Sequence, residues 1–453
     1  MAIKSCPLAF VIQEVLEAGL GVEAASFVEL YMALAHGCSP NLAVFDSPAK
    51  TAEELEMALC SGTLVNANSL DELDRIDAIL QGLSRDSGCG LHIGGKGVSA
   101  SSTFDIDTVR VGIRLNPLVG AGALSELSTS VPNSKFGVPV MPLNIAAVID
   151  AFRRWPWMVA LHAHVGSQGF ALEKLAEGIA TLCDVADEVD EALGKGRVKL
   201  LDIGGGLPAN YKSNEVTPTF HDYAAVLRRK APKLFTNGER TVVTEFGRSL
   251  VAKTAITVST IEYVRQNVAV MATEGGPPAA PDAPTSSTIG ADAICSTDEK
   301  NGTSIPTTEG QGQGEQPQPP APAGHQTLVT HMGADLFLRS SYCPEHYAHR
   351  LSVYNRNGEA LSGPAITTEV AGPLCFEGDY VARGSKLPRA AAGDLVVAHD
   401  TGANTISLFS RHCSRRAPAV YGYAVGLDGQ LNVKLIKKKE SVRDVAKFWG
   451  ASV

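Results

Sequence analysis

The chain has 453 residues, of which 44% are hydrophobic and 19% charged, and its net charge is −9. This composition is typical of a globular protein of two domains, gives no support for binding a nucleic-acid backbone, and includes no apolar run long enough for a membrane span. The nine cysteines include no CxxC pair, so they predict a reducing compartment, cytoplasmic or inside an organelle, and no metal site.

The first 255 residues alternate between short apolar runs and amphipathic stretches. The apolar runs lie at 2–4, 21–26, 42–47, 63–68, 109–116, 158–167, 198–206 and 241–247. Helix-like segments lie at 9–18, 52–60, 70–83, 172–193 and 223–234, and Thr51 with Glu54 forms a capping-box pattern before the second of them. Eight strands alternating with helices predict a (β/α)8 TIM-type barrel over residues 1–255. An open doubly wound sheet is the alternative.

Residues from about 272 to 326 are rich in Pro, Gly, Ser, Thr and Gln. Such a segment buries too little apolar surface to offset its ordering entropy, so we predict a disordered insert. Strand-like sequence on both sides, at 254–264 and 327–338, places the insert within a domain. Further β character at 365–370, 394–399, 405–409, 420–425 and 431–436, with a closing helix at 442–449, predicts a β-sheet or β-barrel domain over residues 256–453.

The first predicted strand is unusually short. Strands average about 5–6 residues, yet only Met1 to Lys4 is available before the next helical segment. We therefore expect the barrel to be N-terminally truncated, with a natural start upstream of Met1.

Polar residues gather where the predicted strands end, which is where a TIM barrel carries its active site. Lys4 ends the first strand, His162 and His164 share one face of the sixth, and Glu245 ends the eighth. The glycines 204–206 follow the seventh strand and could bring backbone N–H groups close to a phosphate. A lysine that forms an imine and a carboxylate that keeps a pyridine nitrogen protonated are the groups pyridoxal-phosphate chemistry needs. Taken singly, each of these residues, and the glycine turn, has an ordinary structural explanation.

The segments together resemble the fold-type III pyridoxal-phosphate decarboxylases, in particular diaminopimelate and ornithine decarboxylases, whose barrel is of the alanine-racemase type. The similar segments occur in the family's order: 2–4 (A-I-K), 114–117 (R-L-N-P), 134–137 (S-K-F-G), 161–168 (L-H-A-H-V-G-S-Q), 201–206 (L-D-I-G-G-G), 245–248 (E-F-G-R) and 372–379 (G-P-L-C-F-E-G-D). The resemblance implies decarboxylation of an amino-acid substrate.

The resemblance also implies residue roles. Lys4 would bind pyridoxal 5′-phosphate as an imine, His164 would stack on the pyridine ring, and Glu245 would pair with the ring nitrogen. Arg114 would support Glu245 or the ring. The phosphate would be held by a set of small and basic residues: Ser167, Gly204, Gly205, Gly206, Gly247 and Arg248. Cys375 would protonate Cα in the site of the partner subunit, so we expect a homodimer with shared active sites.

Two positions depart from the family's pattern. Asn404 stands where the family has a tyrosine that reaches the cofactor phosphate, which weakens that contact. Phe376 follows Cys375, where the named decarboxylases have an acidic residue for the distal amine of the substrate. Glu377 would point to the opposite face of an extended strand, and Asp379 is a further candidate. We therefore predict that ornithine and meso-diaminopimelate are poor substrates, and that a less basic or bulkier amino acid is preferred.

Two other functions stay open at this point. An amino-acid racemase on the same barrel needs a second base facing the lysine, and no clear one is found. A catalytically impaired relative that acts through protein association is the other, because of the short first strand and Asn404.

Overall fold

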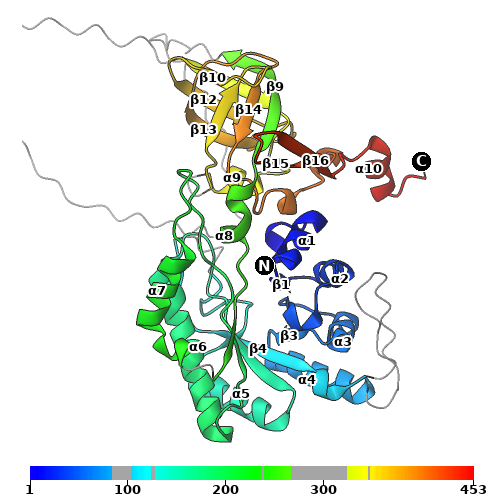
Figure 1. Ribbon diagram of the computed structural model, residues 1–453, viewed down its shortest axis with the longest axis vertical. Coiled ribbons are helices and arrows are strands. Elements are labelled where there is room, and N and C mark those ends of the chain that lie inside the picture. Colours follow the sequence, from blue (N-terminus) through cyan, green and yellow to red (C-terminus); the bar gives the residue numbers. More distant parts are fainter. Residues whose placement is uncertain (84–103, 124–127, 237–238, 267–323, 345–346, 453) are drawn as a thin grey trace, which may run out of the picture.

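The computed structural model describes residues 1–83, 104–123, 128–236, 239–266, 324–344 and 347–452. They form two sheet domains that follow one another along the long axis of the molecule, with the N-terminus between them (Figure 1). Most of the predicted insert, from about residue 272 to residue 323, lies outside the described residues. Its predicted end is wrong, because His325 and Gln326 belong to a strand of the second sheet and Gln326 is buried.

The first sheet is parallel throughout. Its strands are β1 (Val22–Ala24), β2 (Ala43–Asp46), β3 (Leu64–Ala67), β4 (Arg110–Asn116), β5 (Val138–Pro139), β6 (Met158–His162), β7 (Leu200–Asp202) and β8 (Thr241–Val243). They run in the order β1-β2-β3-β4-β6-β7-β8, with β5 paired to β4. The helices are α1 (Ala9–Glu17), α2 (Phe27–Ala35), α3 (Ala52–Ser61), α4 (Leu70–Leu83), α5 (Pro142–Arg154), α6 (Leu172–Leu193), α7 (Phe220–Lys230) and α8 (Arg248–Val251).

Residues 2–4 do not form the strand predicted for them. Ala2 makes a single parallel bridge to Glu23, and its N–H donates to the carbonyl of Phe246 at 2.9 Å, while Ile3–Ser5 form a 3-10 turn. This short connection joins β1 to the chain that follows β8, so the parallel sheet curls on itself. The predicted alanine-racemase-like barrel with a sheet domain is confirmed. A cavity of about 360 Å³ opens between β1 and β8, lined in part by Val22, Leu200 and Val243.

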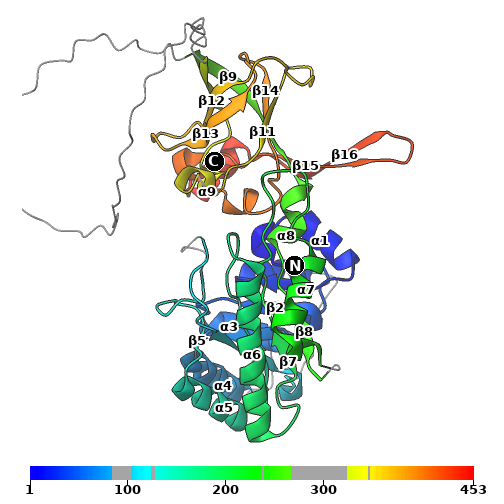
Figure 2. The same ribbon diagram turned by 90° about the vertical axis from the view of Figure 1, so that its left-hand side faces the viewer.

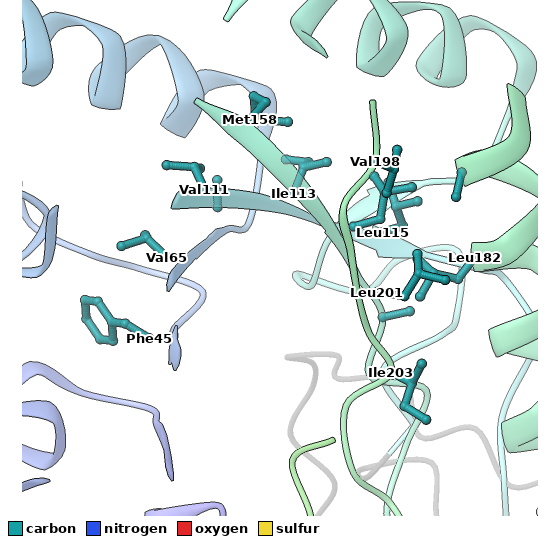
Figure 3. Close-up of a cluster of buried hydrophobic side chains, with 14 of the residues drawn as sticks. Phe45, Val65, Val111, Ile113, Leu115, Met158, Leu182, Val198, Leu201 and Ile203 are labelled. Atoms are coloured by element: carbon teal, nitrogen blue, oxygen red, sulfur yellow. The ribbon is translucent and has the colours of Figure 1, made fainter. Parts of the chain in front are cut away.

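Period-two alternation divides the strand residues between two faces of the curled sheet. The outward face packs against the helices: Phe45, Val65, Val111 and Met158 pair across β2, β3, β4 and β6 in one row, as Figure 3 shows. The inward face is apolar at its start, with Val44, Leu64, Ala160 and Leu200 in contact. Two residues further along the strands the same face becomes polar, which prepares the site described below.

Local sequence fixes where several helices begin. Thr51 accepts a hydrogen bond from the N–H of Glu54 while the Glu54 side chain accepts from the N–H of Thr51, which confirms the predicted capping box of α3. Thr219 and Asp222 make the same arrangement at α7. Gly62 ends α3 in a left-handed conformation, as glycine permits.

The second sheet contains six strands, ordered β11-β14-β9-β10-β12-β13. Their bounds are β9 (Thr257–Gln266), β10 (His325–Thr330), β11 (Leu351–Tyr354), β12 (Ile366–Ala371), β13 (Tyr380–Leu387) and β14 (Leu395–Ala398), with α9 (Leu338–Tyr342) beside them. Its core includes Ile261, Leu328, Val370 and Val396. The predicted strand at 405–409 is wrong, since Ile406–Leu408 form a 3-10 turn.

A two-stranded hairpin of β15 (Val420–Val425) and β16 (Leu431–Lys437) projects from the second domain, and α10 (Val442–Phe448) follows it (Figure 2). The hairpin exposes large apolar side chains on both strands, among them Tyr421, Tyr423 and Val433. Among the described residues, no helix combines the length and the apolar character that crossing a membrane requires.

Candidate active site

A row of polar side chains lies on the inward face of the barrel at the carboxyl ends of the strands. Asp46 pairs in register with Asn66, and His162 pairs with Asp202. All four side chains are buried, and the amide of Asn66 donates to Asp202 at 2.9 Å. They lie two residues beyond the apolar row, so the pleat alone directs them into the barrel mouth.

Lys4 reaches this centre from the 3-10 turn of the N-terminal segment. Its Nζ donates to Oε1 of Glu23 at 2.6 Å, and its side chain keeps 43% of its surface exposed, whereas that of Glu23 is 2% exposed. Burial alone would lower the pKa of Lys4, but the carboxylates of Glu23, Glu245 and Asp46 outweigh it and raise that pKa. Burial raises the pKa of Glu23 to about 7, against the opposing effect of Lys4. Lys4 is thus a partly accessible ammonium group held in place by one carboxylate.

Glu245, just past β8, is buried and neither of its carboxylate oxygens has a hydrogen-bond partner among the described residues. The nearest basic atoms are Nε2 of His162 at 3.5 Å and Nδ1 of His164 at 3.8 Å. Burial would raise the pKa of Glu245, but His162 and then Lys4 hold it below its usual range. Burying a carboxylate without a hydrogen-bond donor costs free energy of folding. We therefore expect a ligand with a hydrogen-bond donor to bind at Glu245.

The two imidazoles of β6 and its extension differ in charge at neutral pH. Burial lowers the pKa of His162, but Asp46, Glu245 and Asp202 overcome this effect and raise it to about 9. Burial and the nearby Arg114 lower the pKa of His164 to about 3. His162 is therefore an imidazolium that stabilises Glu245 as an anion, while His164 is neutral.

His164 is also fixed in orientation. Its Nδ1 accepts a hydrogen bond from the N–H of Gly205 at 3.1 Å, which assigns the ring proton to Nε2. The side chain is 18% exposed, in contrast to that of His162, which is fully buried. His164 thus presents a neutral ring at the barrel mouth, and its stacking on a pyridine ring stays a prediction.

Arg114, for which the resemblance implies support of Glu245 or of the ring, is bonded to Asp46 and not directly to Glu245. Its guanidinium donates to Oδ2 of Asp46 at 3.0 Å and lies over the ring of Phe136, 4.4 Å from the centroid. The other oxygen of Asp46 lies 3.8 Å from His162. Asp46 and His162 thus connect Arg114 to Glu245 as a chain of neighbouring charges.

The glycine loop after β7 approaches its neighbours closely. Gly204 adopts φ +63° and donates its N–H to Asp202, and Gly206 adopts φ +102°. A Cβ on Gly205 would lie 2.4 Å from the carbonyl oxygen of Glu245. Gln168 braces the next turn by exchanging two hydrogen bonds with the backbone of Ala209. The loop is thus fastened to the segments that carry His164 and Glu245.

Arg248 is buried behind this loop. It donates to the hydroxyl of Tyr211 at 3.0 Å, and its Nε has no partner among the described residues. A small cavity beside it is also lined by Arg339, Tyr347, His349 and Asn404. Sequence reasoning missed Tyr211 and this basic, aromatic set, because they come from loops and from the second domain.

Ser167, Gly247 and Asn404 hold the backbone around these groups. Ser167 accepts the N–H of Phe170 at the turn after β6, and a Cβ on Gly247 would collide with the side chain of Ser5. The carbonyl of Ser5 accepts the N–H of Asn404 at 2.8 Å, so the turn that carries Lys4 is attached to the second domain.

Cys375 lies apart from the polar centre, in the loop between β12 and β13, where it is exposed and next to Cys413. Residues 372–379 form turns and not the extended strand that was predicted, so the pleat does not decide where Glu377 points. Asp379 is buried, and its carboxylate accepts the N–H groups of Ala334 and Leu374. Asp379 therefore shapes the loop, and its assignment to the substrate stays a prediction.

Asp46, His162 and Glu245 each place one possible metal ligand within 4.8 Å of the others. The pKa of His162, raised to about 9, makes it a cation at neutral pH, and a protonated imidazole is not a ligand. These side chains fit a charged network better than a metal centre.

Pyridoxal phosphate fits the residues present. Glu245 offers a pyridinium N–H two carboxylate oxygens that lack a hydrogen-bond partner among the described residues. Lys4 offers an amine at the barrel mouth, and the Nε–H of Arg248, also without a partner in that part of the chain, lies behind a glycine loop. Carboxylate, amine, neutral imidazole and phosphate-binding loop define a cofactor site of the pyridoxal-dependent class on a curled parallel barrel.

Comparison with known proteins agrees with this class. Residues 1–252 match the family described as pyridoxal-dependent decarboxylase, pyridoxal binding domain, and residues 311–402 match its C-terminal sheet domain. The chain therefore belongs to the pyridoxal-dependent decarboxylases. It is an enzyme that uses pyridoxal 5′-phosphate to decarboxylate an amino acid.

Several relatives are diaminopimelate decarboxylases. One from Archaeoglobus fulgidus is 24% identical over 407 residues, 88% of this chain and 75% of the relative, and one from Helicobacter pylori is 25% identical over 429 residues, 94% and 82%. Among solved structures, the H. pylori enzyme complexed with L-lysine has a TM-score of 0.70 at 22% identity, covering 99% of this chain and 89% of that one. The lysine/ornithine decarboxylase of Vibrio vulnificus complexed with putrescine has a TM-score of 0.60 at 20% identity, covering 90% and 83%.

Proposed function

We propose that Lys4 holds pyridoxal phosphate covalently and that Glu245 pairs with its ring nitrogen while an amino acid loses its α-carboxylate. The observation that carries this proposal is Glu245, a buried carboxylate that accepts no hydrogen bond from the residues the structure describes and lies beside the imidazolium of His162. The bound cofactor supplies an electron sink for the pair released when the carboxylate leaves.

The charges of the protein groups suit these roles. His162 keeps Glu245 ionised, and an ionised carboxylate keeps a pyridine nitrogen protonated. His164, held neutral by burial and oriented by Gly205, offers an uncharged ring to the cofactor. A cationic imidazole there would oppose the positive ring that Glu245 stabilises.

The phosphate would be held at the other end of the site. The N–H groups of the loop at Gly204, Gly205 and Gly206, the guanidinium of Arg248 and the hydroxyl of Ser167 are the groups we assign to it. Asn404 replaces the tyrosine that the resemblance implies, and Tyr211 already brings a phenol hydroxyl to Arg248. We propose that Tyr211 supplies part of the missing contact.

Cys375 would donate the proton that replaces the carboxylate on Cα, in the site of the partner subunit. Two observations support a homodimer: Cys375 is exposed and apart from the polar centre of its own chain, and the β15–β16 hairpin exposes apolar side chains that an assembled copy would cover.

Borohydride reduction followed by peptide mapping tests the assignment of Lys4. The expected result is a phosphopyridoxyl group on Lys4 in the wild-type protein and on no residue of Lys4→Arg. A label on Lys135, the lysine of the S-K-F-G segment, would show that the cofactor lysine has been misassigned.

The choice of amino acid depends on Phe376. An ammonium group at the far end of diaminopimelate or ornithine needs a carboxylate, because an unpaired buried charge costs several kcal/mol. Phe376 stands where the resemblance implies that carboxylate, and its ring lies edge-on to His412 with centroids 6.2 Å apart. An aromatic ring offers a cation at most about 0.5–2 kcal/mol. We therefore propose that a less basic or bulkier amino acid is the better substrate.

A panel of L- and D-amino acids with CO2 release as the readout tests this choice. Phe376→Glu should gain activity on ornithine or meso-diaminopimelate, whereas Glu377→Gln, the neighbouring control, should leave the wild-type preference unchanged. A kcat/KM of the wild-type protein for either diamino acid on the order of 10⁴ M⁻¹s⁻¹ or more would refute the proposal.

A further inference from the structure

Two cysteines of the second domain lie side by side. Cys375 belongs to the loop between β12 and β13, Cys413 belongs to the 3-10 turn His412–Ser414, and both are exposed. The Cys413 thiol is near enough to Cys375 to raise its pKa. The adjacent residues meet as well, because the rings of Phe376 and His412 lie edge to face with centroids 6.2 Å apart. The two loops therefore face each other at two successive positions.

The backbone on both sides is fixed. The carboxylate of Asp379 accepts the N–H of Leu374 at 2.5 Å and that of Ala334 at 2.6 Å, which anchors the loop beside Cys375. Cys413 adopts φ +54°, a left-handed conformation that residues other than glycine rarely adopt and that surrounding structure must impose. The approach of the two loops is thus built into the fold, and a disulfide requires such pre-arranged neighbours.

We propose that Cys375 and Cys413 form a reversible disulfide with each other, with a low-molecular-weight disulfide such as glutathione disulfide as the oxidant. The structural part of this inference rests on the two loops alone. Its consequence rests on the proposed function, because oxidation would remove the sulfur proton donor from the decarboxylation site and stop turnover.

The exchange takes place in two steps. The thiolate of Cys413 attacks one sulfur of the small disulfide, whose S–S bond breaks and releases one thiol. The thiolate of Cys375 then attacks the sulfur of Cys413 in the mixed disulfide and releases the second thiol. The two protein thiols are oxidised, the small disulfide is reduced, and the cysteine protons pass to the released thiols.

We assign the first attack to Cys413 because the neighbouring sulfur raises the pKa of Cys375. A cysteine that retains its proton also suits the proton donor that the proposed function needs.

The test uses the full-length protein with its cofactor, equilibrated with glutathione disulfide, alkylated and digested with trypsin. Cleavage after Arg356, Arg383, Arg411 and Arg415 yields one peptide for each cysteine, 357–383 and 412–415. We expect the two peptides joined, with the mass of two hydrogens lost. Decarboxylation should fall at least tenfold in step with the joined fraction and return when excess glutathione is added.

Two variants sharpen the result. Cys413→Ser should keep the reduced activity and resist the oxidant, whereas Cys343→Ser, a control at another cysteine of the same domain, should form the link like the wild type. The absence of the joined peptide in native protein, or a complete link with full activity, would overturn the proposal. If the reduced protein decarboxylates none of the amino acids offered, the proposed function fails, and the joined peptide still decides whether the disulfide forms.

Discussion

Glu245 and Lys4 show how opposite charges share the barrel mouth. Lys4 is paired with Glu23, and Glu245 is stabilised by the nearby charge of His162, with no hydrogen-bond donor in the described part of the chain. The carboxylate nearest the lysine and the carboxylate assigned to the ring nitrogen are therefore different groups. Each can be changed without removing the other.

Replacing Glu245 by Gln should remove the ionised partner of the ring nitrogen. Without it the ring loses much of its electron-withdrawing power, so kcat should fall on the order of 100-fold or more. Steady-state CO2 release measures this loss, and borohydride labelling of Lys4 should persist. An unchanged kcat would contradict the role assigned to Glu245.

Replacing Glu23 by Gln should speed cofactor binding. Imine formation needs the neutral amine, and removing the carboxylate 2.6 Å from Nζ lowers the pKa of Lys4. Each unit of lowering yields about tenfold more neutral amine at a given pH. Stopped-flow absorbance of apoprotein mixed with pyridoxal phosphate should show a rate that rises with pH in the wild type, and a faster rate at neutral pH in Glu23→Gln. Equal rates would mean that the Lys4–Glu23 pair does not limit binding.

Some residues of the site could be predicted from sequence and others could not. Lys4, His164, Glu245 and Arg248 follow from position at strand ends together with the resemblance. Glu23 and Asp46 were missed, although each is an ionisable residue inside an apolar run, because the sequence alone does not say which face of the barrel such a residue takes. Arg114 bonds to Asp46 because the sheet brings their strands together, and the sequence alone does not predict that pairing.

At the scale of elements, the glycine loop after β7 depends on close backbone contact. Gly205→Ala would place a Cβ 2.4 Å from the carbonyl of Glu245. The loop must then shift, which should lower the free energy of unfolding by about 1–3 kcal/mol. We expect a lower Tm together with weaker cofactor binding. Gly82→Ala on α4 is the matched control, since nothing lies within 4 Å of its Cβ position. Calorimetry with and without pyridoxal phosphate measures both effects, and equal behaviour of the two variants would refute the role of the loop.

Element prediction succeeded where local signals dominate. The predicted helices at 70–83 and 172–193 match α4 and α6, because amphipathic periodicity and length identify them. Strand β13 was not predicted, since its sequence YVARGSKL has a glycine and charged residues and its place beside β12 is decided by tertiary pairing. The composition of residues 405–409 predicted a strand, but Ile406–Leu408 form a 3-10 turn.

At the scale of the molecule, the proposed homodimer makes a quantitative prediction. Lys4→Ala and Cys375→Ala each inactivate every site of their own homodimers. A hybrid dimer that shares sites across the interface holds one intact site, so an equal mixture should regain about a quarter of the wild-type activity. Mass measurement of the mixture must show that subunits exchange. Exchange without any recovery of activity would mean that Cys375 serves its own chain or no site.

The attachment of Ser5 to Asn404 makes the second domain part of the machinery that positions the reacting nitrogen. The residue after Lys4 is held on one side by the packing of Gly247 and on the other by a hydrogen bond from the sheet domain. A small rotation between the two domains would therefore displace the amine at the barrel mouth. Both domains therefore hold the residue next to Lys4. A rigid junction between them keeps the amine of Lys4 in one position.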